Sequence, residues 1–205
     1  MFAKPHSLTF PQAASLLLVG TTAADLLHAS AARQGETVLL HGAAGAVGVS
    51  VLQQARQLGV RVIGTASPAN FDFVRRFGAT PVDYGPGLLD RVRYAAPEGI
   101  AAALDAVGSD QAGDVSLALV GDRSRVVTIV AAPRARADGY VFVGASNPES
   151  GPFRAQERSR ILKLAADGHL VVPIAQTFGF TDAPAALAAL TSPHPPGKLA
   201  LINQD

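Results

Sequence analysis

The stretch that most constrains this chain runs from Thr37 to Ser67, TVLLHGAAGAVGVSVLQQARQLGVRVIGTAS. It begins with a β-branched and aliphatic run, residues 37–40, which is typical of a buried parallel strand. After a turn of small residues, a helical segment carries its apolar residues on one face: Val47, Val51, Leu52, Ala55 and Leu58. Gly59 stands where a left-handed residue ends a helix, and residues 60–63 predict a second strand. The stretch therefore predicts a strand–turn–helix–strand unit, the context that a dinucleotide-binding motif requires.

The turn itself reads Ala43-x-Gly45-x-x-Gly48, a glycine motif with alanine in its first position. Gly45 would let the backbone approach a pyrophosphate, and Gly48 would let the helix pack closely on the strands. The phosphates would bind free N–H groups at the helix N-terminus, where the positive end of the helix dipole favours an anion. We predict a dinucleotide site here; the alternative is a tight turn without a ligand.

The end of the second strand favours NADP(H) over NAD(H). Eighteen residues after the last glycine of the motif, where an NAD site usually places an acid on the ribose 2′-hydroxyl, stands Ala66. An acid there would repel a 2′-phosphate, and its absence removes that repulsion. Ser67 and Asn70 can donate hydrogen bonds. Arg75 and Arg76 add positive charge nearby, unless they are only solvated helix residues.

Composition excludes several classes of protein. The 205 residues, 48% of them hydrophobic, suit one domain with a full core, or one domain with a small appendage. A net charge of +1 gives no basic face for nucleic acid or for an acidic membrane surface. The absence of cysteine excludes disulfides, a Cys-based zinc site and a thiol nucleophile, and the five histidines show no metal-ligand spacing. With no signal peptide and no apolar run of the ~18 residues that a membrane span needs, we expect a cytoplasmic protein without metal, membrane or nucleic-acid partners.

Strands and helices alternate along the rest of the chain. A first helix is predicted from Pro11 to about Ala32, and residues 20–22 interrupt it, so it is either one helix or two joined at a bend. The other predicted helices are 71–77, 88–95, 114–120, 153–166 and 183–190, with Gly78, Gly121 and Gly168 closing three of them. The other predicted strands are 80–84, 100–106, 125–131, 140–144 and 198–202, with an extended stretch over 170–174 and a Pro-rich turn over 192–196.

This alternation predicts the fold class, because right-handed crossovers place helices on both faces of a parallel sheet. We expect an α/β fold: a doubly wound parallel sheet (Rossmann) of about six strands with helices on both faces. Residues 1–35 would form a helical lead-in, 36–150 an NADP(H)-binding domain, and 151–205 a C-terminal segment of helices and a strand.

An ordered set of segments adds a family resemblance. They are KPHSLTFPQAASLLLVGTTAADLL, GETVLLHGAAGAVG, VIGTASPANFDFVRRFGA, VDY, LDAVG, RVVTIVA and GKLALIN. Over nearly the whole chain, this succession resembles the medium-chain dehydrogenase/reductases, in their zinc-independent quinone oxidoreductase (zeta-crystallin-like) branch. The resemblance implies a Rossmann cofactor domain and hydride transfer from NADPH to a small-molecule substrate, a quinone or another activated carbonyl or alkene.

Carried over by position, the resemblance implies a set of cofactor-binding residues but no catalytic residue. They are Thr22, Gly45, Ala46, Val47, Gly48, Ser67, Asn70, Tyr84, Val107, Gly108, Ile129, Val130, Ala131 and Lys198. The stretch 45–48 would hold the pyrophosphate, and Ser67, Asn70 and Tyr84 would handle the 2′-phosphate. Thr22 would lie beside the nicotinamide, unless it is only a helix-bend residue. The basic residue that the family usually has before the terminal Gly-Lys pair is here Pro196, for which His194 is a possible substitute.

The chain also departs from the family. Members begin with a β-rich, GroES-like domain that forms the other wall of the substrate cleft, and this chain starts where that domain would end. Residues from about 168 onward would pack against it. We therefore expect cofactor binding, with a non-catalytic or repurposed NADP(H)-binding module (sensor, scaffold or partner-dependent subunit) as the alternative to an enzyme. A methyltransferase is disfavoured, because Ala66 is not the acid that usually holds its ribose.

Three further features carry paired interpretations. His41 is either a pocket residue or a turn histidine bonded to backbone. Asp105 is either a site carboxylate or a residue that caps a helix or bonds a neighbouring turn. The strand Tyr140 to Gly144 would form an exposed sheet edge, through which the resemblance implies a homodimer; the alternative is an edge covered by Pro-rich loops.

Overall fold

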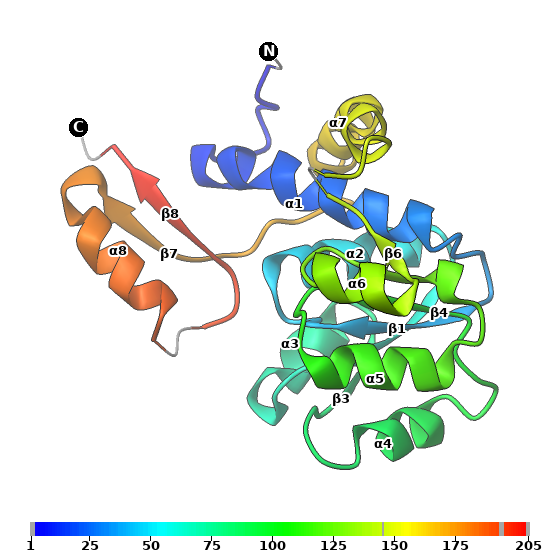
Figure 1. Ribbon diagram of the computed structural model, residues 1–205. Coiled ribbons are helices and arrows are strands. Elements are labelled where there is room, and N and C mark those ends of the chain that lie inside the picture. The colour runs from blue at the N-terminus through cyan, green and yellow to red at the C-terminus, as the bar shows by residue number, and fades with distance from the viewer. Residues whose placement is uncertain (1–2, 145, 193–194, 204–205) are drawn as a thin grey trace.

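A single parallel sheet organises the computed structural model, which describes residues 3–144, 146–192 and 195–203. Its six strands run in the order β3-β2-β1-β4-β5-β6 (Figure 1). They are β1 (Thr37–His41), β2 (Arg61–Thr65), β3 (Thr80–Val82), β4 (Ala102–Asp105), β5 (Val126–Thr128) and β6 (Val141–Phe142). The order reverses between β1 and β4, which places a topological switch point at their carboxyl ends. The predicted doubly wound α/β fold is confirmed.

Helices cover both faces of the sheet. One face packs against α1 (Phe10–Ala29), α2 (Ala46–Gln57) and α3 (Phe71–Arg76), and the other against α4 (Leu88–Ala95), α5 (Asp110–Leu119) and α6 (Ala132–Asp138). Strand β1 contributes side chains to the core on both faces, because Val38 and Leu40 belong to the first core cluster and Leu39 belongs to the second. All three are fully buried, which explains the uninterrupted apolar run in the sequence.

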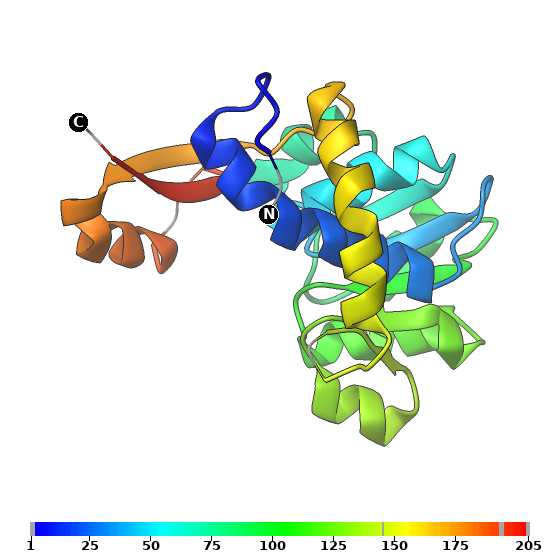
Figure 2. The same cartoon turned by 90° about the horizontal axis from the view of Figure 1, so that it is seen from above.

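A third layer lies outside α1. Helix α7 (Ser150–Ala166) crosses α1 on the side away from the sheet, as Figure 2 shows. Leu16 of α1 and Ile161 of α7 are both fully buried in the cluster between them. An ion pair between half-buried Arg154 and buried Asp25, Nε to Oδ2 at 2.7 Å, joins the two helices.

The bend considered for the first helix is absent, since α1 is continuous. A Cβ on Gly20 would lie 2.6 Å from Cγ2 of Ile161, so the glycine lets α7 cross closely and does not interrupt the helix. The helix begins with a capping box, in which the Thr9 side chain accepts from the amide of Gln12 and the Gln12 side chain accepts from that of Thr9.

Helix α1 also corrects the expectation that no segment has the length and apolarity of a membrane span. By those two criteria alone the helix would qualify, but 56% of its apolar window is buried inside the fold. Its packing against α2 and α7 is that of the core helix of a globular protein.

Several predicted boundaries were wrong. Helix α5 begins at Asp110, four residues before the predicted start at Asp114, and it ends at Leu119 without a left-handed Gly121. Helix α6 was not predicted at all. The predicted strands 80–84, 100–106, 125–131 and 140–144 are each longer than the observed β3 to β6. Their last residues are loops at the sheet's carboxyl edge, and β4 to β6 also begin one or two residues later than predicted.

The C-terminal segment forms a small unit of its own. Strand β7 (Ile174–Gly179) pairs in parallel with β8 (Lys198–Ile202). It was not predicted, because the extended stretch expected over 170–174 shares only Ile174 with it. Helix α8 (Ala183–Leu190), as predicted, connects them, and the unit lies beside the N-terminal half of α1 (Figure 1). The predicted Pro-rich turn and the suggested role of His194 involve residues 193–194, which are outside the described residues.

Candidate functional site

A cavity of about 550 Å³ opens at the carboxyl ends of β1, β2 and β4, at the switch point of the sheet. Ligands of open α/β sheets bind at this position. Its walls come from the glycine turn, the loops after β2 and β3, and the start of α5. The lining residues are His41, Gly42, Ala44, Gly45, Thr65, Ala66, Ser67, Asn70, Tyr84, Gly85, Leu88, Val107, Ser109, Gln111 and Ala112.

The glycine turn is held against β2. Gly42 has a φ of 83°, and its amide donates to Oγ1 of Thr65 at 3.1 Å. A Cβ on Gly48 would lie 2.2 Å from the carbonyl oxygen of Gly42, so only glycine fits there. A Cβ on Gly45 would meet only that same oxygen, at 3.3 Å. The fold itself thus requires Gly48, whereas Gly45 leaves open space at the turn.

Helix α2 presents an uncapped N-terminus at this turn. Its N-cap is Gly45, which has no side chain to accept a hydrogen bond. The first amide with a helical partner is that of Val49, which donates to the carbonyl of Gly45. Within the described part of the chain, the amides of Ala46, Val47 and Gly48 have no acceptor. These three donors and the positive end of the helix dipole favour an anion.

The loop after β2 supplies neutral polar groups. Nδ2 of Asn70 donates to Oγ of Ser67 at 3.2 Å, and both residues line the cavity with Tyr84, which is 57% exposed. The positive charge expected from Arg75 and Arg76 is not in this cavity. Arg75 pairs with Asp72 at 2.7 Å, and Arg76 lines a different cavity. Among the described lining residues, none is an aspartate or a glutamate.

On the opposite rim, Asp105 joins two loops. Its Oδ1 accepts the amides of Val107–Gly108, each at 2.9 Å, and its Oδ2 accepts from Oγ1 of Thr128 at 2.8 Å. The same Thr128 oxygen accepts the amides of Val130–Ala131, each at 3.1 Å. Asp105 and Thr128 are buried, so this relay fixes the loops after β4 and β5 to each other. Of the two interpretations of Asp105, the structure supports the bond to a neighbouring turn.

His41 is part of the cavity wall. The residue is 2% exposed, and its Nε2 lies 3.1 Å from the side-chain oxygen Oγ of Ser116. His41 is therefore a pocket residue, and the interpretation as a turn histidine bonded to backbone was wrong. Burial lowers the pKa of His41 to about 4, although the nearby charge of Asp105 raises it. The imidazole is therefore neutral at pH 7 and acts here as a hydrogen-bonding group.

Of the predicted site residues, those that line this cavity are Gly45, Ser67, Asn70, Tyr84 and Val107. Three others lie apart from it. Thr22 is buried within α1, and Ile129 packs against the core. Lys198 begins β8, where its amide donates to the carbonyl of Pro173 at 2.8 Å. It lines a small space together with Ala46 of α2, so the C-terminal unit reaches the start of that helix.

Sequence reasoning missed the residues at the start of α5. Ser109 caps that helix by accepting from the amide of Ala112 at 3.2 Å. Oε1 of Gln111 accepts from the amide of Gly85 at 2.8 Å and joins two walls of the cavity. The signal was available, because a serine followed by an acid is a common helix start. In the described residues, no group of three or more His, Cys, Asp or Glu side chains is placed to hold a metal ion.

Comparisons with known proteins show similarity to dehydrogenases and quinone oxidoreductases. A family model described as zinc-binding dehydrogenase matches residues 77–201. The polyketide synthase system protein NorB of Streptomyces orinoci is 33% identical over 96% of this chain, which spans 10% of NorB. The quinone oxidoreductase of Coxiella burnetii has a TM-score of 0.79 and 30% identity, covering 97% of this chain and 62% of that one. Mycobacterial Rv1454c, solved with NADPH, has a TM-score of 0.79 and 28% identity, covering 97% and 66%. The chain thus spans at most about two thirds of these relatives.

Proposed function

The chain belongs to the medium-chain dehydrogenase/reductase superfamily and is quinone-oxidoreductase-like, and from that premise we propose that it is the NADP(H)-binding part of an oxidoreductase. The bound cofactor would supply hydride to a small-molecule substrate, a quinone or another activated carbonyl or alkene. Residues 36–150 would be the cofactor domain, and 151–205 would complete the cleft with a further domain. We propose that this part of the enzyme holds no zinc, since it has no cysteine. We also propose that the enzyme is cytoplasmic.

One observation carries this proposal: the unpaired amides of Ala46, Val47 and Gly48 at the start of α2, beside a cavity at the switch point. They suit the pyrophosphate, for which Gly45 leaves room. A similar fold has been solved with NADPH bound, in Rv1454c.

The loop after β2 supports a preference for NADP(H) over NAD(H). Ser67, Asn70 and Tyr84 line the cavity there and can donate hydrogen bonds to a 2′-phosphate. No described carboxylate lines the cavity to repel that phosphate or to hold a free 2′-hydroxyl. The preference would come from neutral donors alone, because Arg75 and Arg76 lie outside the cavity.

The opposite rim would receive the nicotinamide. The loops of residues 107–108 and 129–131, fixed by Asp105 and Thr128, would line it. Thr22 and Lys198 would complete the cofactor contacts once the cleft is closed. No side chain of this part is assigned the proton donor.

Cofactor binding tests this proposal directly. We expect the chain to bind NADPH more tightly than NADH, measured by the fluorescence of the reduced nicotinamide. Ser67→Asp should weaken NADPH binding at least about tenfold, because a carboxylate would face the 2′-phosphate, and should change NADH binding much less. Ser159→Asp adds the same charge on exposed α7 and should leave both affinities unchanged. Equal affinities for the two cofactors in the unchanged chain would contradict the preference.

Turnover distinguishes enzyme from binding module. Oxidation of NADPH with a panel of quinones by this chain alone would establish an enzyme, whereas tight binding without turnover would favour the sensor, scaffold or partner-dependent subunit. NorB is a polyketide synthase system protein, so the panel should also include the activated alkenes already named as possible acceptors. A chelator should not change the rate.

The proposed homodimer would use the edge strand of the sheet. Strand β6 pairs only with β5 among the described strands, which leaves its other side at the edge. Within the segment Tyr140 to Gly144, only residues 141–142 form the strand. The amide of Val143 donates to Thr128 of β5, so by alternation the amide of Phe142 faces the free edge. Sedimentation analysis of the chain and of Phe142→Pro, which removes that outward donor, tests whether copies pair there.

A further inference from the structure

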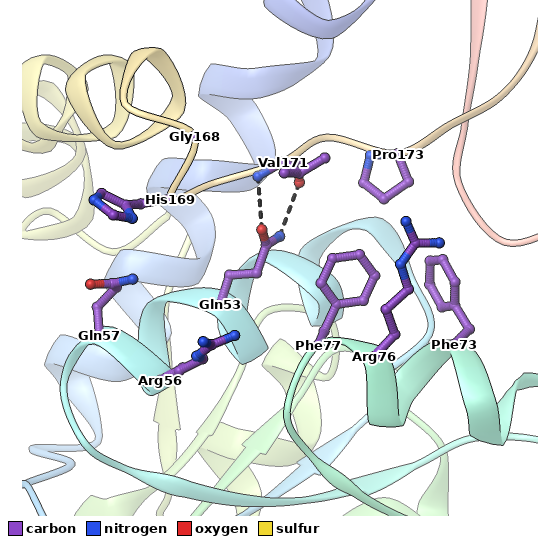
Figure 3. A pocket seen from close by; sticks show the side chains of 10 residues that line it. All are labelled: Gln53, Arg56, Gln57, Phe73, Arg76, Phe77, Gly168, His169, Val171 and Pro173. Atoms are coloured by element: carbon purple, nitrogen blue, oxygen red, sulfur yellow. Dashed lines mark hydrogen bonds between the residues drawn. The ribbon is translucent and has the colours of Figure 1, made fainter.

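A second cavity, of about 410 Å³, lies between the last turns of α2, helix α3 and the segment 168–173 (Figure 3). Its lining residues are Gln53, Arg56, Gln57, Phe73, Arg76, Phe77, Gly168, His169, Val171 and Pro173. None of them lines the cavity at the switch point. Its volume lies within the ~300–1,000 Å³ of small-molecule sites. We name it the arginine cavity.

One wall of the arginine cavity is fixed by a single side chain. Oε1 of Gln53 accepts from the amide of Val171 at 2.7 Å, and its Nε2 donates to the carbonyl of Val171 at 2.9 Å (Figure 3). The same Nε2 donates to the carbonyl of Val49, one turn earlier in α2. This pairing holds the segment 168–173 across α2, so the cavity is a built feature of the fold.

Two guanidinium groups in the cavity are unpaired. Arg56 and Arg76 have no hydrogen bond or ion pair to any described residue. Their neighbour Arg75, in contrast, pairs with Asp72. Each of the two stands at the end of its helix, where a positive charge complements the helix dipole, but the dipole does not require the two to share one cavity.

No described Asp or Glu lines this cavity to offset the two charges. The other polar groups around them are the amide of Gln57 and the ring of His169, both exposed. The cavity therefore combines fixed positive charge with neutral hydrogen-bonding groups, a combination that suits an anion.

An aromatic surface adjoins the charges. The rings of Phe73 and Phe77 are half-buried and meet edge to face, with centroids 5.1 Å apart. Figure 3 shows the Arg76 side chain among them, directed toward Pro173. A half-buried aromatic pair beside a guanidinium favours a ligand that has a flat ring as well as a charge.

We propose that the arginine cavity binds a small phosphate monoester bearing a planar ring, with the phosphate held by Arg56 and Arg76 and the ring packed on Phe73 and Phe77. A phosphate monoester carries a charge of about −1.5 to −2 at pH 7, which matches two guanidinium groups. Forked guanidinium donors also fit phosphate oxygens geometrically. This site is separate from the proposed cofactor cleft and does not depend on it.

Titration calorimetry with phenyl phosphate tests the proposal. We expect the chain to bind phenyl phosphate, and the double variant Arg56→Gln/Arg76→Gln to bind it at least about tenfold more weakly. Arg75→Gln removes one charge from the same helix outside the cavity and should bind as the unchanged chain does. Phe77→Leu should weaken phenyl phosphate and leave inorganic phosphate unaffected. Both arginines are exposed, so the double variant should keep its melting temperature.

Two results would overturn the proposal. One is no binding of phenyl phosphate by the unchanged chain, or equal binding by the double variant. The other is displacement of phenyl phosphate by saturating NADPH, which would place the ligand in the cofactor cleft. Retained phenyl phosphate binding in a Gly45→Asp variant, whose cofactor site is blocked, would support the separate location.

Discussion

Replacing Asp105 tests whether the two loops at the nicotinamide end of the proposed site are held by one buried carboxylate. Asp105→Asn keeps the shape of the side chain and one carbonyl oxygen for the amides of Val107–Gly108. It replaces Oδ2 by an N–H₂ group, which cannot accept the hydroxyl of Thr128, now 2.8 Å away. That hydroxyl loses its acceptor in a buried site, since Thr128 is 0% exposed.

The expected loss follows from the bonds that change. One hydrogen bond to a charged group contributes about 1.5–3 kcal/mol, so Asp105→Asn should lower the free energy of unfolding by about 2 kcal/mol. Thr128→Val removes the same bond and also leaves the amides of Val130–Ala131 without their acceptor, so its cost should be at least as large. Because the single changes share one bond, the double variant should lose less than the sum of the two.

Urea unfolding followed by circular dichroism gives the free energies, and nicotinamide fluorescence gives the NADPH affinity. Loosened loops should weaken NADPH binding in both single variants, whereas Thr128→Ser, which keeps the hydroxyl, should preserve it. Asp105 does not hold the two loops if the free energy of unfolding of Asp105→Asn lies within about 0.5 kcal/mol of that of the unchanged chain and its NADPH affinity is the same.

Three further changes test other parts of the site. Gly48→Ala should lower the free energy of unfolding by about 1–3 kcal/mol in a urea titration, because its Cβ would lie 2.2 Å from the Gly42 oxygen; unchanged stability would refute the close approach. Gly45→Asp should abolish NADPH binding while the melting temperature stays near that of the unchanged chain, since its carboxylate would face the pyrophosphate. In the folded chain the pKa of His41 is lowered from 6.5 to about 4. Between these two pH values the unfolded chain therefore binds more protons than the folded chain does. The free energy of unfolding should fall by roughly 3 kcal/mol as the pH drops through this window. Urea titrations at pH 7 and pH 4.5 should show a smaller acid loss in His41→Gln, and equal losses would contradict this account.

Local patterns predicted the elements well where packing and sequence agree. The strand–turn–helix–strand unit, helix α4 over 88–95 and strand β8 over 198–202 lie where apolar periodicity and glycine ends placed them. The glycines Gly59 and Gly168 adopt the left-handed conformation expected after a helix. Periodicity could not mark where β5 and β6 end, because residues 129–131 and Val143 stay apolar as the chain leaves the sheet.

Local reasoning was wrong where a distant segment decides the conformation. In the sequence, Gly20 indicates a helix interruption. In the structure it lies against Ile161 of α7 within a continuous helix. Arg75 and Arg76 are adjacent in sequence, yet one pairs with Asp72 and the other enters a second cavity. Which way each arginine points depends on the packing of α3, and on the segment 168–173, far away in the chain.

Local sequence was enough to place the glycine turn and most of the succession of strands and helices, α6 and β7 excepted, because hydrophobic period and backbone freedom are properties of neighbouring residues. Which polar groups meet depends on how the segments pack together in three dimensions. Asp105 and Thr128 bond across two strands, and His41 reaches Ser116 on α5. Such contacts depend on the register and packing of segments distant in the chain, which no local pattern encodes.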